Sequence, residues 1–209
     1  MTGPKIDIFK LHKAEYKAGK KPVIVETNRA MYLAVAGKDA PGAGDFQAAI
    51  AALYGMAYTV KMGRKADGKG DYTIGKLEGI YWTADGTDLG DASPDQWCWL
   101  LVIRTPELVD GFPVTDKDLD TARARLRDKK KEAGSERVKL KYLEEGPCVQ
   151  MLHVGPYDKE HETISIMLEY CRAEGFTPHG RHHEIYLSDP RRVAPEKLKT
   201  ILRMRIKRA

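Results

Sequence analysis

The chain has 209 residues, of which 42% are hydrophobic and 31% charged, a balance typical of a folded globular protein and not of a disordered or fibrous one. No apolar run is long enough to span a bilayer, and the first residues lack the apolar segment of a signal peptide, so we expect a cytoplasmic protein without a membrane partner. Cys98, Cys148 and Cys171 are far apart, which argues against a disulfide framework and a closely spaced zinc site.

The net charge of +5 raises the question of nucleic-acid binding. Much of the basic excess lies between Arg123 and Lys141, on a polar helix and its exit, where charged runs usually form solvated faces. The sequence has no helix-turn-helix pattern, zinc knuckle or RNA-binding aromatic motif. We therefore expect no nucleic-acid partner.

The first half of the chain predicts two strands, a helix and two further strands. Residues 22–26 and 30–36 are strand-like, and the second segment is apolar enough to be buried on both faces. After a glycine-containing loop, Asp45 is expected to cap a helix, because its carboxylate can accept the free amide hydrogens of the first turn. The expected core face of this helix is Phe46, Ala49, Ile50, Leu53, Ala57 and Val60. Residues 72–82 and 96–103 predict the next two strands.

A polar helix over about 116–132, with Thr115 and Asp118 as a capping box, connects to the second half. There, 138–143 and 148–154 predict strands, and Asp158 is expected to cap a helix that ends at Gly175. Its expected core face is Ile164, Met167, Leu168 and Cys171. Residues 182–187 and 200–206 predict two last strands, and in the second Leu202, Met204 and Ile206 alternate with Arg203 and Arg205.

The order strand-strand-helix-strand-strand therefore occurs twice, over about 22–104 and 137–207. Strands mixed with single helices predict an α+β protein with antiparallel sheets and two pseudo-repeated β-α-β-β units.

One acidic residue, Glu184, lies within a strand-like segment and shares a face with His182 and Tyr186. A half-buried carboxylate needs an arginine, a proton or a cationic ligand, because an unpaired buried charge is costly. A structural ion pair is the alternative to a ligand site. His182 and His183 point to opposite faces, so we expect no metal. Without a nucleophile elbow, a phosphate loop or a dinucleotide motif, we also expect no cofactor.

Aromatic residues are the candidates for the walls of a ligand site, because aromatic faces attract cations and stack on flat rings. The candidates are Trp82, Trp97, Trp99, Tyr58, Tyr157 and Tyr186. The alternative is core packing, which we expect for about half of them. Tyr157 lies in a Gly-Pro-Tyr turn, where core packing is harder to explain. His153, on the strand before that turn, is either a polar group of the pocket or a hydrogen-bonded core histidine.

Three segments resemble the GyrI-like small-molecule-binding family: 148–157 (CVQMLHVGPY), 184–192 (EIYLSDPRR) and 195–203 (PEKLKTILR). Residues 46–65 and 77–79 are similar to the stand-alone, full-length branch of that family. The resemblance covers about 6–206, and we expect no DNA-binding segment ahead of it.

The resemblance implies one domain over 1–209, built from a duplicated module with a central ligand cleft. It implies a small hydrophobic or cationic aromatic ligand, a planar xenobiotic, bound by Glu184 and several of the aromatic residues. One branch of the family hydrolyses cyclopropane-bearing DNA-alkylating natural products in an aromatic cage, and here Glu184 and Tyr157 would be the catalytic residues. Three functions stay open: a binding protein that detoxifies, a hydrolase that adds water, and a modulator of a gyrase-like target.

Overall fold

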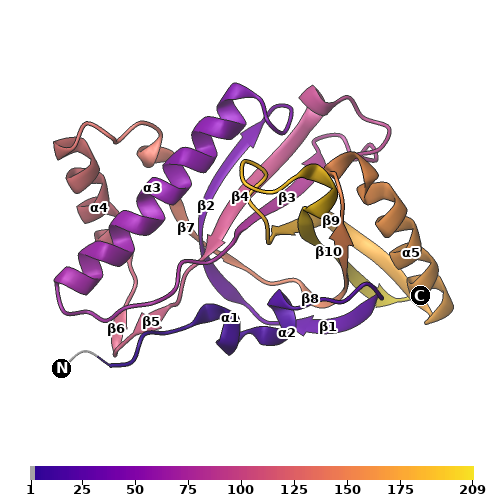
Figure 1. Ribbon diagram of the computed structural model, residues 1–209, viewed down its shortest axis with the longest axis horizontal. Coiled ribbons are helices and arrows are strands. Elements are labelled where there is room, and N and C mark those ends of the chain that lie inside the picture. Colours follow the sequence, from indigo (N-terminus) through magenta and orange to yellow (C-terminus); the bar gives the residue numbers. More distant parts are fainter. Residues whose placement is uncertain (1–2) are drawn as a thin grey trace. The chain divides into compact units, whose positions relative to one another are not determined.

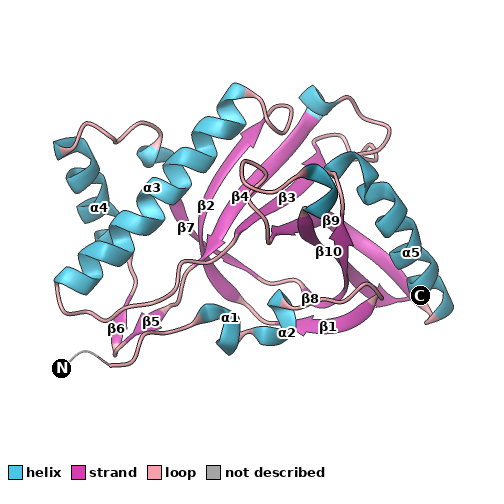
Figure 2. Ribbon diagram, viewed as in Figure 1, coloured by secondary structure: helices cyan, strands magenta, loops and turns pink. Residues whose placement is uncertain are grey.

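The computed structural model describes residues 3–209, which form two compact units (Figures 1 and 2). The first unit comprises 3–11, Ala30–Gly75 and Tyr81–Leu143, and the second comprises His12–Arg29, Lys76–Ile80 and Glu144–Ala209. Each unit combines antiparallel strands with packed helices, which confirms the α+β class. Among residues 3–209, no helix is both long and apolar enough to cross a bilayer.

The first unit is built on three strands, β2 (Ala30–Lys38), β4 (Trp97–Arg104) and β7 (Lys139–Leu143). Strand β2 lies between the other two and is antiparallel to both, and the last residues of β3 (Leu77–Thr83) belong to the same unit. Helix α3 (Gly44–Ala66) packs along β2 and β4 and against helix α4 (Asp116–Asp128). The short elements are α1 (Ile8–Leu11), η1 (Pro94–Gln96), β5 (Leu108–Val109), β6 (Phe112–Pro113) and η2 (Ser135–Arg137).

Strands β2 and β4 form the centre of the first unit. Met31, Leu33 and Val35 are buried, and so are Tyr32 and Ala34 between them, so both faces of β2 are covered, as its apolar sequence predicts. In α3, Met56 is buried but Ile50 is half-buried, which corrects the expected core face. The expected strand over 72–82 is shorter: Tyr72 forms an isolated bridge with Ile6, and β3 begins at Leu77.

Gly37 on β2 is a tight point in this core, because it lies opposite Trp99 on β4. A Cβ atom at Gly37 would overlap the indole ring of Trp99. We expect Gly37→Ala to lower the free energy of unfolding by about 1–3 kcal/mol, as overpacked substitutions do. Gly55→Ala is the matched control: no atom lies within 4 Å of its Cβ position in α3, so it should raise the free energy of unfolding by about 0.4–1 kcal/mol. Guanidinium unfolding measures the free energy of unfolding of both variants. An equal change in the two would contradict the prediction.

The second unit is built on β1 (Val23–Thr27), β8 (Gly146–Val154), β10 (Lys199–Arg208) and β9 (Phe176–Tyr186), neighbours in that order and antiparallel. The first residues of β3 belong to this unit. Helix α5 (Glu160–Ala173) packs on β8, β9 and β10, and α2 (Lys13–Tyr16) packs on β1. The remaining elements are η3 (Tyr157–Lys159) and η4 (Pro195–Lys197).

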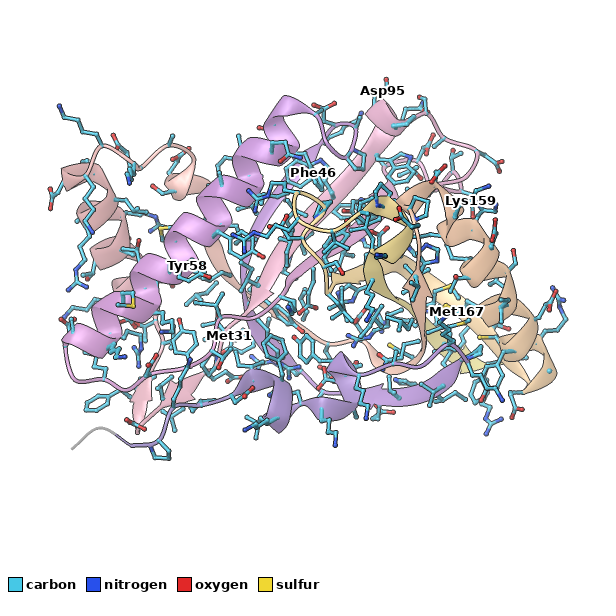
Figure 3. All side chains as sticks on the ribbon, in the orientation of Figure 1. Met31, Phe46, Tyr58, Asp95, Lys159 and Met167 are labelled. Atoms are coloured by element: carbon cyan, nitrogen blue, oxygen red, sulfur yellow. The ribbon has the colours of Figure 1, made fainter. Side chains whose placement is uncertain are left out.

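Apolar side chains of α5 and of the strands form the core of the second unit. Met167 lies on α5 (Figure 3). With Cys171 of the same helix it packs against Val149 and Met151 of β8 and Leu202 of β10. Leu168, which the helical spacing places in the core, is instead exposed. Helix α5 ends before Gly175, whose φ of 72° lies in the left-handed region that glycine adopts readily.

Both expected aspartate caps are wrong, whereas the expected capping box is confirmed. Asp45 lies within the first turn of α3, and its carboxylate pairs with Arg137 at 2.6 Å, a contact from a distant segment. Asp158 lies in η3, before α5 begins, and makes no cap. Thr115 and Asp118 do form the capping box at the start of α4.

The strand pairing crosses the two expected repeats. Strand β1, from the first repeat, pairs with β8, and β7, from the second, pairs with β2. The repeat boundaries and the single domain over 1–209 stay predictions.

Candidate functional site

Glu184 lies near the end of β9, opposite Leu202 of β10, and only 8% of its surface is exposed. The hydroxyl of Tyr186 donates to its Oε2 at 2.6 Å, and His182 Nε2 lies 3.1 Å from its Oε1. The three side chains therefore share one face of the strand, as the alternation of β-strands predicts. The ion-pair alternative named an arginine as the partner, but the described partners are a histidine, a tyrosine and a second carboxyl group.

That second carboxyl group is Glu160, the first residue of α5, which the sequence analysis missed. It is 6% exposed, and its Oε1 has no hydrogen-bond partner among residues 3–209. One of its carboxyl oxygens lies within 4.8 Å of a carboxyl oxygen of Glu184. Nothing in the sequence connects two residues that are 24 positions apart, and only the packing of α5 on β9 does so.

The two carboxyl groups are held in opposite protonation states. Burial and the negative charge of Glu184 raise the pKa of Glu160 to about 9. Burial alone would also raise the pKa of Glu184, but hydrogen bonds from His182, Tyr186 and Glu160 outweigh it and hold the pKa below its usual value. At neutral pH the pair therefore consists of a neutral acid and a carboxylate.

Glu160, His182 and Glu184 each offer one ligand atom, and these atoms lie within 4.8 Å of one another. Carboxylates and imidazole are ordinary ligands of zinc and manganese. We expected no metal because the adjacent histidines His182 and His183 point to opposite faces. That argument did not consider Glu160, which lies near His182 and Glu184. The absence of a metal stays a prediction.

Tyr157 lies beside this cluster and is 40% exposed. Its ring meets that of Tyr186 edge to face, with centroids 5.9 Å apart. Burial and the charges of Glu160 and Glu184 raise the pKa of Tyr157 to about 12. Its hydroxyl therefore keeps its proton at neutral pH, so it is suited to donate a hydrogen bond and not to act as a base.

His153 is a buried histidine with both ring nitrogens engaged. Nδ1 lies 2.9 Å from Thr163 Oγ1 on α5, and Nε2 lies 3.2 Å from the carbonyl oxygen of Pro156. These contacts hold the turn before Tyr157 against α5. The core alternative for His153 therefore fits its geometry, and a direct ligand contact would require one of these bonds to break.

The other four predicted aromatic residues belong to the first unit, so their place relative to Glu184 stays a prediction. Trp99 is fully buried and packs edge to face on Phe46, with centroids 5.3 Å apart. Trp97 packs against Tyr81, and its Nε1 is buried without a partner in the described chain. Trp82 is half-buried. Tyr58 lies on α3 (Figure 3), and it is 55% exposed.

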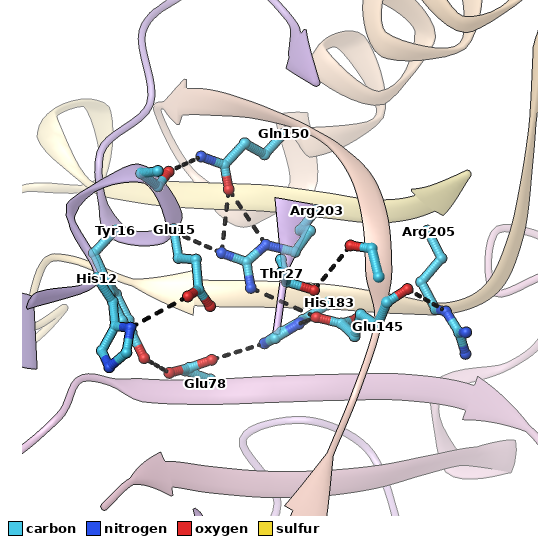
Figure 4. Close-up of polar contacts among 12 residues, drawn as sticks. His12, Glu15, Tyr16, Thr27, Glu78, Glu145, Gln150, His183, Arg203 and Arg205 are labelled. Atoms are coloured by element: carbon cyan, nitrogen blue, oxygen red, sulfur yellow. Dashed lines mark hydrogen bonds and ion pairs between the residues drawn. The ribbon is translucent and has the colours of Figure 1, made fainter. Parts of the chain in front are cut away.

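His183 precedes Glu184 in β9, so its side chain points to the other face of the strand. There it lies in a buried polar network (Figure 4). Its Nε2 lies 3.0 Å from Glu78 Oε2 on β3, and its Nδ1 lies 2.8 Å from Glu145 Oε2. The hydroxyl of Tyr16 donates to the other oxygen of Glu78 at 2.6 Å. Neither Glu78 nor Glu145 was among the site residues predicted from the sequence.

Arg203 of β10 completes this network. The arginine is 1% exposed. It donates to the backbone oxygen of Glu15 at 2.6 Å and to Gln150 Oε1 at 3.1 Å, and it pairs with Glu145 at 3.5 Å. Leu202, Met204 and Ile206 do lie on one face of β10, packed in the core. The other face, which carries Arg203, is covered by residues 12–17, and no local sequence pattern predicts this cover.

The network predicts a loss of stability in alkaline solution. Burial lowers the pKa of His183, but the charges of Glu145 and Glu78 outweigh burial and raise it from 6.5 to about 9. A raised histidine pKa stabilises the fold fully below pH 6.5, and this contribution is lost as the pH rises to about 9. We expect the free energy of unfolding to fall by roughly 2–3 kcal/mol across this window.

Glu160 titrates in the same direction, so the measurement is best made in a Glu160→Gln background. Its raised pKa destabilises the fold progressively from pH 4.5 to about 9. In that background the remaining alkaline loss is assigned to His183. Urea unfolding measured at several pH values between 5 and 9 tests this, and a flat profile would contradict the assignment.

Comparison with known proteins agrees with this fold. A family model described as the GyrI-like small molecule binding domain matches residues 23–207. An uncharacterized conserved protein from Listeria innocua is 39% identical, with a TM-score of 0.88 over 97% of this chain and 100% of its own.

Two structures of proteins described as hydrolases from Listeria innocua are similarly close. They are 37% and 38% identical, with TM-scores of 0.85 and 0.86, and they cover 97% and 98% of this chain and all of their own. No curated protein sequence matches the chain significantly.

Proposed function

Because the chain belongs to the GyrI-like small-molecule-binding domain family, we propose that the cluster of Glu184, Tyr186 and Tyr157 is its ligand site. The proposed ligand is a planar, hydrophobic xenobiotic, and the protein lowers the free concentration of such a compound in the cytoplasm. The observation that carries this proposal is a buried carboxylate bordered by two aromatic rings, one of them 40% exposed.

The charge of the site favours a cationic ligand. A buried carboxylate is costly unless a positive charge or several hydrogen bonds compensate it. A cation held against Glu184 would add that compensation, and the faces of Tyr157 and Tyr186 would attract the same charge by about 0.5–2 kcal/mol each. A neutral planar compound would gain the stacking but not the ion pair.

A matched pair of probes tests this proposal: N-methylacridinium, a permanent cation, and acridine, which has the same planar ring system without the charge. We expect Glu184→Gln to weaken binding of the cation at least about tenfold, the effect of losing a charged hydrogen-bonding partner. Binding of acridine should change little. Fluorescence titration measures both.

The control is Glu162→Gln, which removes an exposed carboxylate from the same helix, α5. It should leave both affinities unchanged. If the Glu184 variant binds the cation as tightly as the unchanged protein does, the carboxylate is not part of the ligand site.

A second candidate is a hydrolase that opens a cyclopropane-bearing DNA-alkylating drug by adding water. Two findings favour it: a neutral acid and a carboxylate side by side, and the similarity to proteins described as hydrolases. Pairs of carboxyl groups with divergent pKa values are suited to acid–base chemistry.

In this reaction Glu184, the ionised member of the pair, would be the base, and Tyr157 would be the hydrogen-bond donor. A water oxygen bonds to the ring methylene while the strained carbon–carbon bond breaks, and its electron pair moves to a conjugated carbonyl oxygen. Glu184 accepts the proton that water loses, and Tyr157 donates a hydrogen bond to the oxygen that becomes negative before it takes up a proton. Mass spectrometry of drug incubated with the protein tests for the product with one water added, formed over many turnovers.

A further inference from the structure

The site contains two buried carboxyl groups, Glu160 and Glu184. The hydrogen bonds from His182 and Tyr186 go to Glu184, and Glu160 Oε1 has no partner among the described residues. The two residues are only 6% and 8% exposed, and an oxygen of one carboxyl group lies within 4.8 Å of an oxygen of the other. Two ionised carboxylates so close together repel strongly, so one of them keeps a proton. The helix and the strand that carry them fix this closeness, because α5 packs on β9.

The groups that face Glu160 explain which of the two keeps the proton. On β9 these are Glu184, His182 and Tyr186, and both His182 and Tyr186 direct their hydrogen bonds to Glu184. On η3 it is Tyr157, whose hydroxyl is neutral, and on β10 it is the buried hydroxyl of Thr200. Glu184 therefore receives the compensating contacts, and Glu160 Oε1 is left without a partner among the described residues.

We propose that Glu160 stores a proton in the free protein and releases it to solvent when a cationic ligand binds against the carboxyl pair. The site then exchanges a proton for a cation, and both carboxylates face the ligand. This inference rests on the proposed ligand site. It adds that Glu160 makes the site distinguish charged from neutral compounds, because only a cation displaces its proton.

The exchange has a consequence for affinity. When binding releases one proton, affinity for the cation rises about tenfold for each unit of pH over the range in which free Glu160 is protonated. Acridine displaces no charge while its ring nitrogen is unprotonated, so its affinity should not change from neutral pH to about pH 9. A structural role of Glu160 would change both affinities together and produce no such difference.

Isothermal titration calorimetry at neutral pH, in two buffers with different ionisation enthalpies, counts the protons released. The probes are N-methylacridinium and acridine, and the proteins are the unchanged chain, Glu160→Gln and the control Glu162→Gln, all dialysed against EDTA. We expect close to one proton released per cation by the unchanged chain and by the control. Glu160→Gln should bind the cation with no proton released and with no dependence of affinity on pH.

Three results of these binding measurements would overturn the inference. Cation binding without proton release would leave the ligand site in place but remove the exchange. Equal release from Glu160→Gln would assign the proton to another group. Tight one-to-one binding of zinc, lost in Glu160→Gln, would make the cluster a metal site instead.

Infrared spectroscopy gives a readout that needs no ligand, so it separates failure of the exchange from failure of the proposed function. The free protein at neutral pH should show the carbonyl stretch of a buried protonated carboxyl group, which disappears in Glu160→Gln. If this band is present but neither probe binds, Glu160 does store a proton, but the proposed ligand is wrong. The exchange of that proton for the ligand is then wrong too. If the band is absent, the stored proton is refuted whatever the probes do.

Discussion

Arg203→Met is expected to lower the free energy of unfolding by about 3–5 kcal/mol, the usual cost of removing one partner from a buried charge network. The arginine donates to the backbone of Glu15 and to Gln150, and it pairs with Glu145. Methionine fills much of the same volume, so the loss measures the contacts and not a cavity. The buried Gln150 Oε1 would lose its charged donor, and Glu145 would keep only His183 as a positive partner. Leaving a buried acceptor without its donor is costlier than never having had the pair.

Guanidinium unfolding followed by circular dichroism measures this change. Arg208→Met is the control on the same strand: Arg208 is exposed, and its guanidinium lies 4.3 Å from the ring centre of Phe176. Its loss should cost no more than about 1 kcal/mol, the value of an exposed cation–π contact. If the two variants are equally stable, the network around Arg203 contributes little to folding.

The fold was largely accessible from the sequence, because the strongest signals are local. Apolar continuity in 30–36 predicts a strand buried on both faces, and β2 confirms it. Helical spacing predicts α3 and α5, although their boundaries and caps differ. The partners of each strand were less accessible: the pairing of β1 with β8 brings together segments more than 100 residues apart, and no local pattern encodes it.

The site was accessible only in part. Strand alternation alone places His182, Glu184 and Tyr186 on one face, and the structure confirms that contact. Glu160 is a helical acid like its exposed neighbour Glu162, and the difference between them is the strand on which α5 packs. Arg203 is similar: its sequence context is a polar face, and its burial comes from residues 12–17.

If the protein is a hydrolase, Glu184→Gln is expected to lower kcat by about 10²–10⁴, the usual contribution of a general base. The amide keeps the shape and the hydrogen-bonding capacity of the side chain but cannot accept a proton from water. A neutral drug gains little from the charge of Glu184, so its affinity should stay nearly the same. Loss of turnover with retained binding separates a base from a residue that only holds the ligand.

Tyr157→Phe separates the second catalytic role from the first. Its hydroxyl keeps its proton because its pKa is raised to about 12, so we expect it to stabilise developing negative charge and its removal to lower kcat by about 10²–10³. The two variants should also differ with pH: Glu184→Gln removes the acidic limb of the pH–rate profile, whereas Tyr157→Phe keeps it. Single-turnover mass spectrometry with Glu162→Gln as the control measures both. A water adduct that forms at the same rate in all four proteins would mean that the ring opens in solution and that the cluster only binds.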